Sequence, residues 1–379
     1  MTTSPENPAD ARARLARSVR VVVKVGSALI TRADGLDIAR VRAIAAQVAE
    51  LRERGLAVAL VSSGSISGGR RTLADRLGAP ADAHARASAA VGQVRLAAAW
   101  ADAFEAHGLV AAQVLLTADD ATDRSRFLNA RATLEELLGL GALPVINEND
   151  TVAADEVRFE DNDRLAAIVA DAVGADILIV LSVVSGLLDA TGTLVEVVKE
   201  VESVLDLVRD EQSAGGTGGM ATKLDAARVA TGSGVSVVIA PGAEHRVLTR
   251  VIDGEPLGTL FPAKQGRDAA RKRWLAHATA HSGVLVVDDG ARTALVDRGA
   301  SLLPAGLTEV SGDFIAGAVV EIRDASGRAF ARGLAAYGST ELRLLVGKRG
   351  SEITEVIGRH DGDAIVHRDD MAILDRAPS

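Results

Sequence analysis

The chain carries a glycine-rich loop, Gly215-Gly216-Thr217-Gly218-Gly219-Met220-Ala221-Thr222-Lys223, that runs directly into a segment of helical periodicity. Glycines let a backbone approach a ligand closely and turn several N–H groups toward one point, and the start of a helix adds partial positive charge. Lys223 follows about one turn inside the predicted helix, where its ammonium can reach the same anion. The loop therefore predicts a phosphate-binding turn.

Lysine is scarce in this chain, which makes the position of Lys223 informative. Six lysines stand among 42 basic residues. Lys24 is another of them, and it stands near the end of a β-branched run and two residues before Gly26. Two scarce lysines at two turns suited to anions indicate a single phosphoryl site.

Other interpretations of a glycine loop fit less well. Gly216 to Ala221 matches the spacing G-x-G-x-x-A, but a dinucleotide fold needs a strand directly before that motif, and residues 209–214 are polar. The sequence has no G-x-x-x-x-G-K-[ST], which disfavours a Walker-type NTPase. A flexible linker before an amphipathic helix stays open on the evidence of the loop alone.

Composition sets wide limits on the class of protein. A chain of 379 residues has room for two or three domains. It has no apolar run long enough to cross a bilayer and no cysteine, so we expect a soluble, cytoplasmic protein without disulfides. The formal net charge of -9 argues against nucleic acid or an anionic membrane as the main partner. The histidines show no metal-ligand spacing, so no metal site made by the protein itself is predicted.

Between residues 18 and 262, apolar β-branched runs alternate with segments of helical period. The predicted strands are 20–25, 57–61, 110–116, 142–146, 177–181 and 235–239. The predicted helices are 37–54, 83–106, 124–138, 162–173, 202–208 and 220–231. Continuously apolar strands separated by helices predict an α/β fold with a mainly parallel sheet covered on both faces.

Polar residues follow the predicted strands, where a parallel sheet binds its ligands. The segments are 24–27, the hydroxyl-rich 62–70, Asn147-Glu148-Asn149-Asp150 and Asp161-Asn162-Asp163. Asp and Asn also favour turns and helix N-caps, which is a structural explanation for either acidic cluster alone. Their occurrence at consecutive strand ends favours a site for a small polar ligand.

These motifs resemble the glutamate 5-kinases of the amino-acid kinase family. The resemblance is carried by Val-Val-Lys24-Val-Gly-Ser, Val61-Ser-Ser63-Gly64-Ser-Ile-Ser-Gly-Gly-Arg70, Arg126-Phe-Leu-Asn-Ala-Arg131, Pro144-Val-Ile-Asn-Glu-Asn-Asp150, Asp161-Asn-Asp163 and Gly216-Thr-Gly-Gly-Met-Ala-Thr-Lys223. It covers nearly everything after residue 17. It implies a three-layer amino-acid-kinase fold and ATP-dependent phosphorylation of the γ-carboxylate of L-glutamate, the first step of proline biosynthesis.

Matching positions imply the roles of individual residues. The resemblance implies catalytic roles for Lys24, Lys223 and Asp163. It implies that glutamate is held by Ser63, Gly64, Asn147, Asp150 and Asn162. It implies that ATP contacts Lys24, Gly26, Ser182, Val183, Thr217, Gly218, Gly219, Met220, Ala221, Thr222 and Lys223. Mg²⁺ is expected to be carried mainly by the nucleotide, because this ion seldom has a full protein cage.

One position departs from the family pattern. After the fifth predicted strand the family usually has Thr or Ser followed by Asp, whereas this chain has Ser182 followed by Val183 and then a short loop. The hypothesis is weaker ATP binding or a relaxed nucleotide preference.

Residues 282–379 are β-rich, with predicted strands over 283–287, 318–322 and 364–367, and they resemble a PUA domain, a fold that elsewhere binds RNA. They hold 11 basic and 15 acidic residues, a net charge of −4, whereas an RNA surface normally needs a basic stripe. We therefore expect a structural or regulatory module. The predicted organisation is a disordered or helical tail over 1–17, a kinase domain over 18–262, a basic helical linker over 263–281 and a PUA-like domain over 282–379.

The resemblance further implies inhibition by proline at a site overlapping that of glutamate, and assembly into a homotetramer or homodimer. Two other functions stay open at this point. One is a kinase of the same family that uses aspartate, acetylglutamate or uridylate as acceptor. The other is a non-catalytic, RNA-associated protein.

Overall fold

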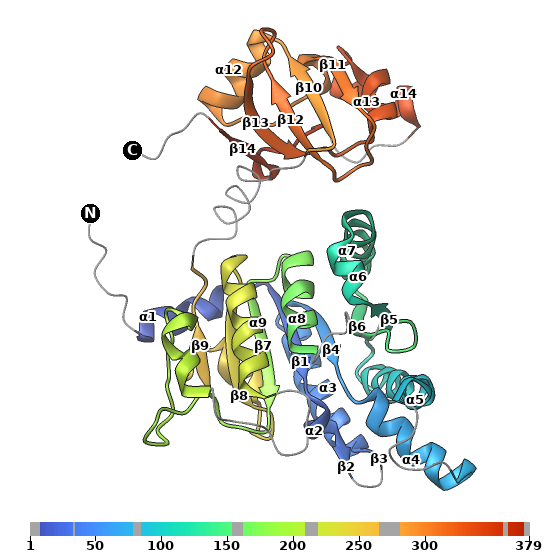
Figure 1. Cartoon of the computed structure of the whole chain (residues 1–379), viewed down its shortest axis with the longest axis vertical. Coiled ribbons are helices and arrows are strands. Elements are labelled where there is room, and N and C mark those ends of the chain that lie inside the picture. The colour runs from blue at the N-terminus through green and yellow to red at the C-terminus, as the bar shows by residue number, and fades with distance from the viewer. Residues whose placement is uncertain are drawn as a thin grey trace. The chain divides into compact units, whose positions relative to one another are not determined.

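A computed structural model describes residues 8–32, 35–78, 85–153, 162–208, 219–264, 281–358 and 363–374 (Figure 1). The chain divides into two compact units, Met1–Gln265 and Gly266–Ser379. The predicted linker lies mostly outside the described residues. Within the described ranges no helix is both long enough and apolar enough to span a membrane.

The first unit is built on a seven-stranded sheet. In spatial order its strands are β5 (Ala111–Leu116), β6 (Leu143–Glu148), β4 (Ala57–Ser62), β1 (Arg20–Val25), β7 (Ile177–Ser182), β8 (Ser236–Pro241) and β9 (Thr259–Phe261). All neighbours are parallel except β8 and β9. Strand β1 is central, with β4 on one side and β7 on the other, so the strand order reverses there. The carboxyl ends of these three strands are where a doubly wound sheet binds ligands.

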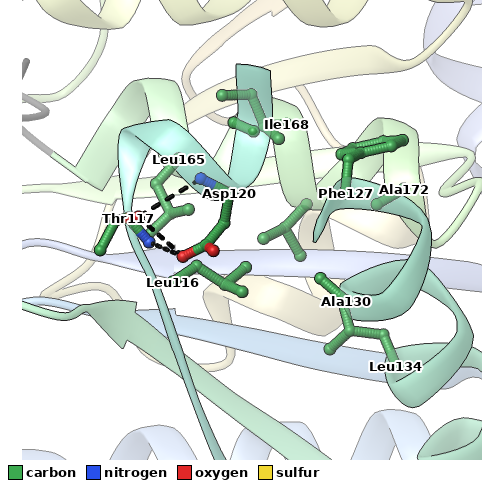
Figure 2. A pocket seen from close by; sticks show the side chains of 11 residues that line it. Leu116, Thr117, Asp120, Phe127, Ala130, Leu134, Leu165, Ile168 and Ala172 are labelled. Carbon is green, nitrogen blue, oxygen red and sulfur yellow. Dashed lines mark hydrogen bonds between the residues drawn. The ribbon is translucent and has the colours of Figure 1, made fainter. Parts of the chain in front are cut away.

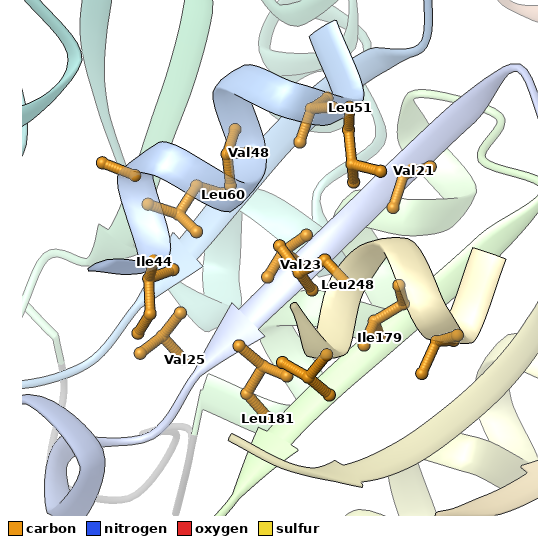
Figure 3. Packing of buried hydrophobic residues seen from close by; sticks show 14 of the residues in the cluster. Val21, Val23, Val25, Ile44, Val48, Leu51, Leu60, Ile179, Leu181 and Leu248 are labelled. Atoms are coloured by element: carbon orange, nitrogen blue, oxygen red, sulfur yellow. The ribbon is translucent and has the colours of Figure 1, made fainter. Parts of the chain in front are cut away.

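Side chains of β1 alternate between two cores because successive residues of a strand point to opposite faces. Val21, Val23 and Val25 pack with helices α3 (Ile38–Glu53), α5 (Ala85–Glu105) and α10 (Val247–Ile252), as Figure 3 shows in part. Val22 packs on the other face with α7 (Arg124–Gly139), α8 (Asn162–Ala172) and α9 (Met220–Gly232). Burial on both faces explains the continuously apolar strands, and it places Lys24 on the α8 and α9 side.

The six strands and six helical segments predicted for this unit are confirmed within two residues at each end, although Val201–Val208 is a 3-10 helix, η3. Helix α4 (Ser65–Leu77) was not predicted, because its glycines and serines resemble a loop. Those glycines allow close packing instead. A Cβ at Gly69 would lie 1.7 Å from the carbonyl oxygen of Ser88 on α5, and one at Gly92 would lie 1.7 Å from that of Ser65.

Within the predicted tail, residues 8–17 form α1 (Pro8–Ala13) and the 3-10 helix η1 (Arg14–Arg17). The guanidinium of Arg12 is buried and donates to the carbonyl groups of Glu196, Glu255 and Gly258 at 3.0, 2.9 and 2.7 Å. This part of the tail is therefore attached to the first unit.

The second unit has a five-stranded sheet in the order β11 (Leu307–Gly312), β10 (Gly283–Val287), β12 (Val319–Arg323), β13 (Ala329–Leu334) and β14 (Met371–Ile373). Helices α12 (Asp289–Arg298), α13 (Ser339–Leu345) and α14 (Ile353–Ile357) accompany it. The predicted strand over 364–367 is wrong. Val366 forms one isolated bridge with Leu302, and the chain then enters a 3-10 turn at Arg368, which ends the pairing.

Candidate active site

Three buried charges meet at the carboxyl end of β1. Lys24 Nζ lies 2.6 Å from Asp163 Oδ1, and Lys223 Nζ lies 3.1 Å from Asp163 Oδ2. Lys24 is the penultimate residue of β1, Asp163 is in the first turn of α8, and Lys223 is in the first turn of α9. All three residues are at most 7% exposed. We call Lys24, Asp163 and Lys223 the lysine–aspartate triad.

The triad holds Asp163 in its ionised form. Burial alone would raise the pKa of its carboxyl group, but the charges and hydrogen bonds of Lys24 and Lys223 outweigh burial and keep the pKa below the ordinary 3.8. Two ammonium groups and one carboxylate leave a charge of +1 within the triad. Two buried ammonium groups at one strand end favour an anionic ligand, because water screens their charge poorly there.

The start of α9 forms the neighbouring wall of the site. Thr222 Oγ1 is within hydrogen-bond reach of Asp163 Oδ2 (3.1 Å) and of the Gly219 carbonyl (2.9 Å). Met220 is buried, and Gly219 is the N-cap residue of the helix. Thr217 and Gly218 lie outside the described residues, as does Asp161.

Gly26 follows β1 and is not required by the packing of the protein itself. Its φ of -74° is open to any residue, and an added Cβ would meet only ordinary contacts, with the Leu181 carbonyl and Lys24 Nζ at 3.8 Å. A glycine here keeps space open next to the Lys24 ammonium.

A cluster of amides and hydroxyls lies at the ends of β4 and β6. The Asn162 side-chain nitrogen Nδ2 donates to Asn147 Oδ1 at 2.7 Å, and to the Ser62 carbonyl and Ser63 Oγ at 3.2 Å each. Asn147 and Asn162 are buried. The structure thus brings the predicted residues Ser63, Asn147 and Asn162 together from two strand ends and one helix start.

Asp150 and Gly64 border the same strand ends. Asp150 Oδ2 accepts a hydrogen bond from Ser65 Oγ at 3.1 Å, and Asp150 is 8% exposed. Gly64 is the N-cap residue of α4 with φ of 112°, a left-handed conformation that glycine adopts without strain. Because α4 begins here, its positive end is available to an anionic group next to Ser63.

Ser182 ends β7, beside β1, and Val183 follows it. Ser182 is buried, whereas Val183 is 65% exposed, so the side chain that departs from the family pattern points to solvent at the edge of the site. Gly186 fits tightly next to Thr259, where an added Cβ would lie 2.6 Å from Thr259 Oγ1. The short loop after Val183 is therefore fixed against β9.

A small apolar pocket lies elsewhere in this unit, between β5, the short helix α6 (Ala118–Thr122), α7 and α8 (Figure 2). Phe127, Leu134 and Leu165 are among its walls, and Asp120 is its one charged lining residue. None of the predicted site residues lines it. A small ligand with several charges would not be matched by these walls, so the polar strand ends are the better candidate site.

Two contacts of the site come from α5 and were not predicted. Gln93 Oε1 accepts from Asn147 Nδ2 at 2.7 Å, and Trp100 Nε1 donates to Ser62 Oγ at 2.9 Å. Nothing in the sequence around these residues resembles a binding motif. Their proximity depends on how closely α5 packs, which periodicity does not indicate.

Comparison with known proteins places these observations in a family. Residues 19–241 match the amino acid kinase family, and residues 283–357 match the PUA domain. A glutamate 5-kinase of Methylococcus capsulatus is 45% identical over 96% of this chain and 99% of its own length. One of Syntrophotalea carbinolica is 43% identical over 95% of this chain and 98% of its own length. The comparison thus extends over both units.

Proposed function

The chain belongs to the glutamate 5-kinases of the amino acid kinase family, and we propose that it transfers the γ-phosphoryl group of ATP to the γ-carboxylate of L-glutamate. One carboxylate oxygen attacks the γ-phosphorus, the bond to the β,γ-bridging oxygen breaks, and ADP leaves with that electron pair. The product is L-glutamyl 5-phosphate, the first intermediate of proline biosynthesis.

The lysine–aspartate triad is the observation that carries this proposal. Phosphoryl transfer needs positioning and charge stabilisation more than covalent help from the protein. An anionic acceptor approaches an anionic nucleotide, so their repulsion must be offset where they meet. Lys24 and Lys223 supply that positive charge, and Asp163 holds both ammonium groups in place at 2.6 and 3.1 Å.

No general base is required for this reaction. The side-chain carboxyl of glutamate has a reference pKa of about 4.3, so it is already an ionised nucleophile near neutral pH. The absence of a histidine from the triad agrees with this chemistry.

The nucleotide phosphates are proposed to lie between Gly26 and the start of α9. Support comes from the space that Gly26 leaves open, from the N-terminus of α9, and from the glycine-rich sequence that precedes it. Thr217, Gly218, Gly219, Met220, Ala221 and Thr222 belong to this proposed phosphate loop. Ser182 and Val183 are proposed to face the base and ribose.

Glutamate is proposed to bind next to this loop, at Ser63, Gly64, Asn147, Asp150 and Asn162. The Asp150 carboxylate offers a partner for the α-ammonium group, and the start of α4 offers one for a carboxylate. Hydroxyl and amide groups that already contact one another need little reorganisation on binding, which favours affinity.

Mg²⁺ is expected to enter with the nucleotide. The one carboxylate of the triad is engaged by two lysines, so the triad offers the metal no open oxygen ligand. The nucleotide phosphates would hold the ion together with water, as is common for Mg²⁺.

Regulation and assembly form the finer part of the proposal. Inhibition by proline at a site overlapping that of glutamate, a homotetramer or homodimer, and a cytoplasmic location are supported by family membership alone. For the PUA domain we propose a structural or regulatory role, because its net charge does not favour RNA.

A panel of acceptors tests the proposal. ATP- and Mg²⁺-dependent ADP formation is measured with glutamate, aspartate, acetylglutamate and UMP, each at several concentrations. We expect kcat/KM for glutamate to exceed the other values by at least about 100-fold, the range that an unmatched buried polar group can impose. Preference for another acceptor would reassign the chain to a sister kinase. Folded protein that turns over none of them would refute an enzymatic role.

A further inference from the structure

Gln93 of α5 stands at the outer end of a chain of side-chain amides that leads into the site. Asn147 Nδ2 donates to Gln93 Oε1 at 2.7 Å, and Asn162 Nδ2 donates to Asn147 Oδ1 at 2.7 Å. Gln93 is half-buried, whereas the two asparagines are buried. This row of hydrogen-bonded amides connects α5, which has no binding motif, to two residues that are proposed to bind glutamate.

Two backbone groups decide which amide atoms donate and which accept in this row of hydrogen bonds. The N–H of Glu148 donates to Asn147 Oδ1 at 2.9 Å, and a backbone N–H cannot accept. The Ser62 carbonyl receives Asn162 Nδ2 at 3.2 Å, and a carbonyl cannot donate. Asn147 must therefore point its nitrogen toward Gln93, and Gln93 must present its oxygen.

The same anchors decide what Asn162 offers a ligand. Its nitrogen faces the Ser62 carbonyl, Ser63 Oγ and Asn147, so its oxygen Oδ1 points away from these partners. No residue in the described ranges donates a hydrogen bond to this oxygen. An acceptor of fixed orientation that receives no hydrogen bond from these ranges is suited to a donor on the substrate, and the donor that glutamate carries is its α-ammonium group.

We infer that Gln93 is a positioning residue that sets recognition of the substrate's α-ammonium group through Asn147 and Asn162. The inference rests on the proposed function. If Gln93 loses its acceptor, the buried Asn147 nitrogen has no partner on that side. Turning the Asn147 amide over would place its NH₂ group against the Glu148 N–H, so neither orientation is satisfied. Asn147 then holds Asn162 less firmly.

Gln93→Met tests the inference, because methionine keeps the length and shape of the side chain and removes the acceptor. We expect KM for glutamate to rise about tenfold, in line with one buried hydrogen bond lost from binding. We expect kcat, KM for ATP and the melting temperature to change little. Gln93→Glu keeps an acceptor toward Asn147 and should stay within about threefold of wild type. Val94→Ala, on an exposed neighbour, is the control.

Glutarate is glutamate without the amino group. It therefore separates a loss of ammonium recognition from a non-specific loss of affinity at the glutamate site. Its inhibition constant against glutamate should be unchanged by Gln93→Met while KM for glutamate rises. The Gln93→Met effect should also vanish in an Asn147→Ala background, because both changes interrupt one chain of contacts.

The inference is overturned if Gln93→Met leaves KM for glutamate unchanged in an active enzyme, or weakens glutarate equally. It is also overturned if the effect is the same size in the Asn147→Ala background, or if only stability falls. A wild-type protein without activity toward glutamate would instead refute the proposed function itself.

Discussion

The two units of this chain each hold a carboxylate between two cations, and the cations differ. In the first unit Asp163 lies between Lys24 and Lys223, whose side chains are 2% and 9% exposed. In the second unit Glu321 on β12 lies between Arg323 at 2.8 Å and Arg332 at 3.4 Å, whose side chains are 39% and 20% exposed. Both carboxylates have a pKa below the ordinary value, because their cations outweigh the effect of burial.

The difference lies in how far water screens the positive charge. Around Glu321 the side chains of Arg323 and Arg332 are 39% and 20% exposed, so water screens part of their charge, and we interpret the cluster as a structural ion pair. In the lysine–aspartate triad both ammonium groups are buried, where water screens their charge poorly. We propose that this charge attracts an incoming phosphate. The comparison thus separates a cluster that stabilises a domain from one that serves a ligand.

Removing one buried lysine should give the largest effect. We expect Lys24→Met to lower kcat for glutamate phosphorylation by about 10³-fold, the cost typical of losing one preorganised charge or donor at a transition state. Steady-state kinetics at saturating ATP and glutamate measure it. Lys348→Met, on an exposed lysine of the second unit, should leave kcat unchanged. A decrease of less than tenfold for Lys24→Met would contradict the role assigned to the triad.

Asp163→Asn should show how strongly the triad depends on its carboxylate. The two buried ammonium groups then lose the carboxylate between them, which should cost about 3 kcal/mol in the free energy of unfolding. Urea denaturation measures this cost, and Asp225→Asn, which affects an exposed ion pair with Arg228, should cost much less. Equal costs for the two variants would mean that the buried carboxylate of the triad stabilises the fold no more than the carboxylate of an exposed ion pair.

The same variant has a predicted pH dependence. Since the pKa of Asp163 is lowered in the folded protein, its contribution is fully present above the ordinary 3.8 and is lost as the pH falls through the lower folded value. The stability difference between wild type and Asp163→Asn should therefore stay constant from neutral pH to about pH 5 and shrink only in stronger acid. A difference that shrinks between pH 7 and pH 5 would argue against the lowered pKa.

Glu321→Gln is the matching change in the second unit and should have a smaller effect. Its two arginine partners are partly exposed to water, so we expect a loss of about 1 kcal/mol in unfolding free energy. Glutamate kinase activity should be unaffected. If this variant abolished activity while the protein stayed folded, the division between a structural and a ligand-binding cluster would fail.

Val183→Asp addresses nucleotide recognition and should have the smallest effect. A carboxylate at this exposed position can accept a hydrogen bond from a ribose hydroxyl, so ATP should bind about threefold more tightly, or about 0.6 kcal/mol. Isothermal titration with ATP measures the change. Val184→Asp is the control at the next exposed position. Equal ATP affinity in wild type and Val183→Asp would remove Val183 as a determinant.

Much of the fold was predictable because the residues that favour strands and helices locally are also the ones that the fold buries. Strand β1 is buried on both faces, so its run of valines predicts a central parallel strand, and the scarcity of lysine singles out Lys24 and Lys223. The sequence could not show that Asp163 joins the two lysines, since this depends on how β1, α8 and α9 meet in space. The resemblance to a family supplied that residue instead.

Other features lie beyond local patterns. The sequence of helix α4 resembles a loop because it contains glycine, which has a low helix propensity. At position 69 glycine is needed because α5 approaches the backbone closely there. Gln93 carries no motif, because its role depends on the side of α5 that meets Asn147. Residues 364–367 have strand-like composition, but of these four only Val366 forms a β-bridge, with Leu302. In each case tertiary contact overrides the local preference.

The most direct test of the central claim is to trap the acyl phosphate made by wild type and by Lys223→Ala. Incubation with glutamate, ATP, Mg²⁺ and hydroxylamine should yield γ-glutamyl hydroxamate, which mass spectrometry distinguishes from the α-hydroxamate by its fragments. We expect wild type to form the γ-hydroxamate and folded Lys223→Ala to form it about 10³-fold more slowly. Equal yields from the two proteins, or no γ-hydroxamate from wild type, would contradict the account of this site.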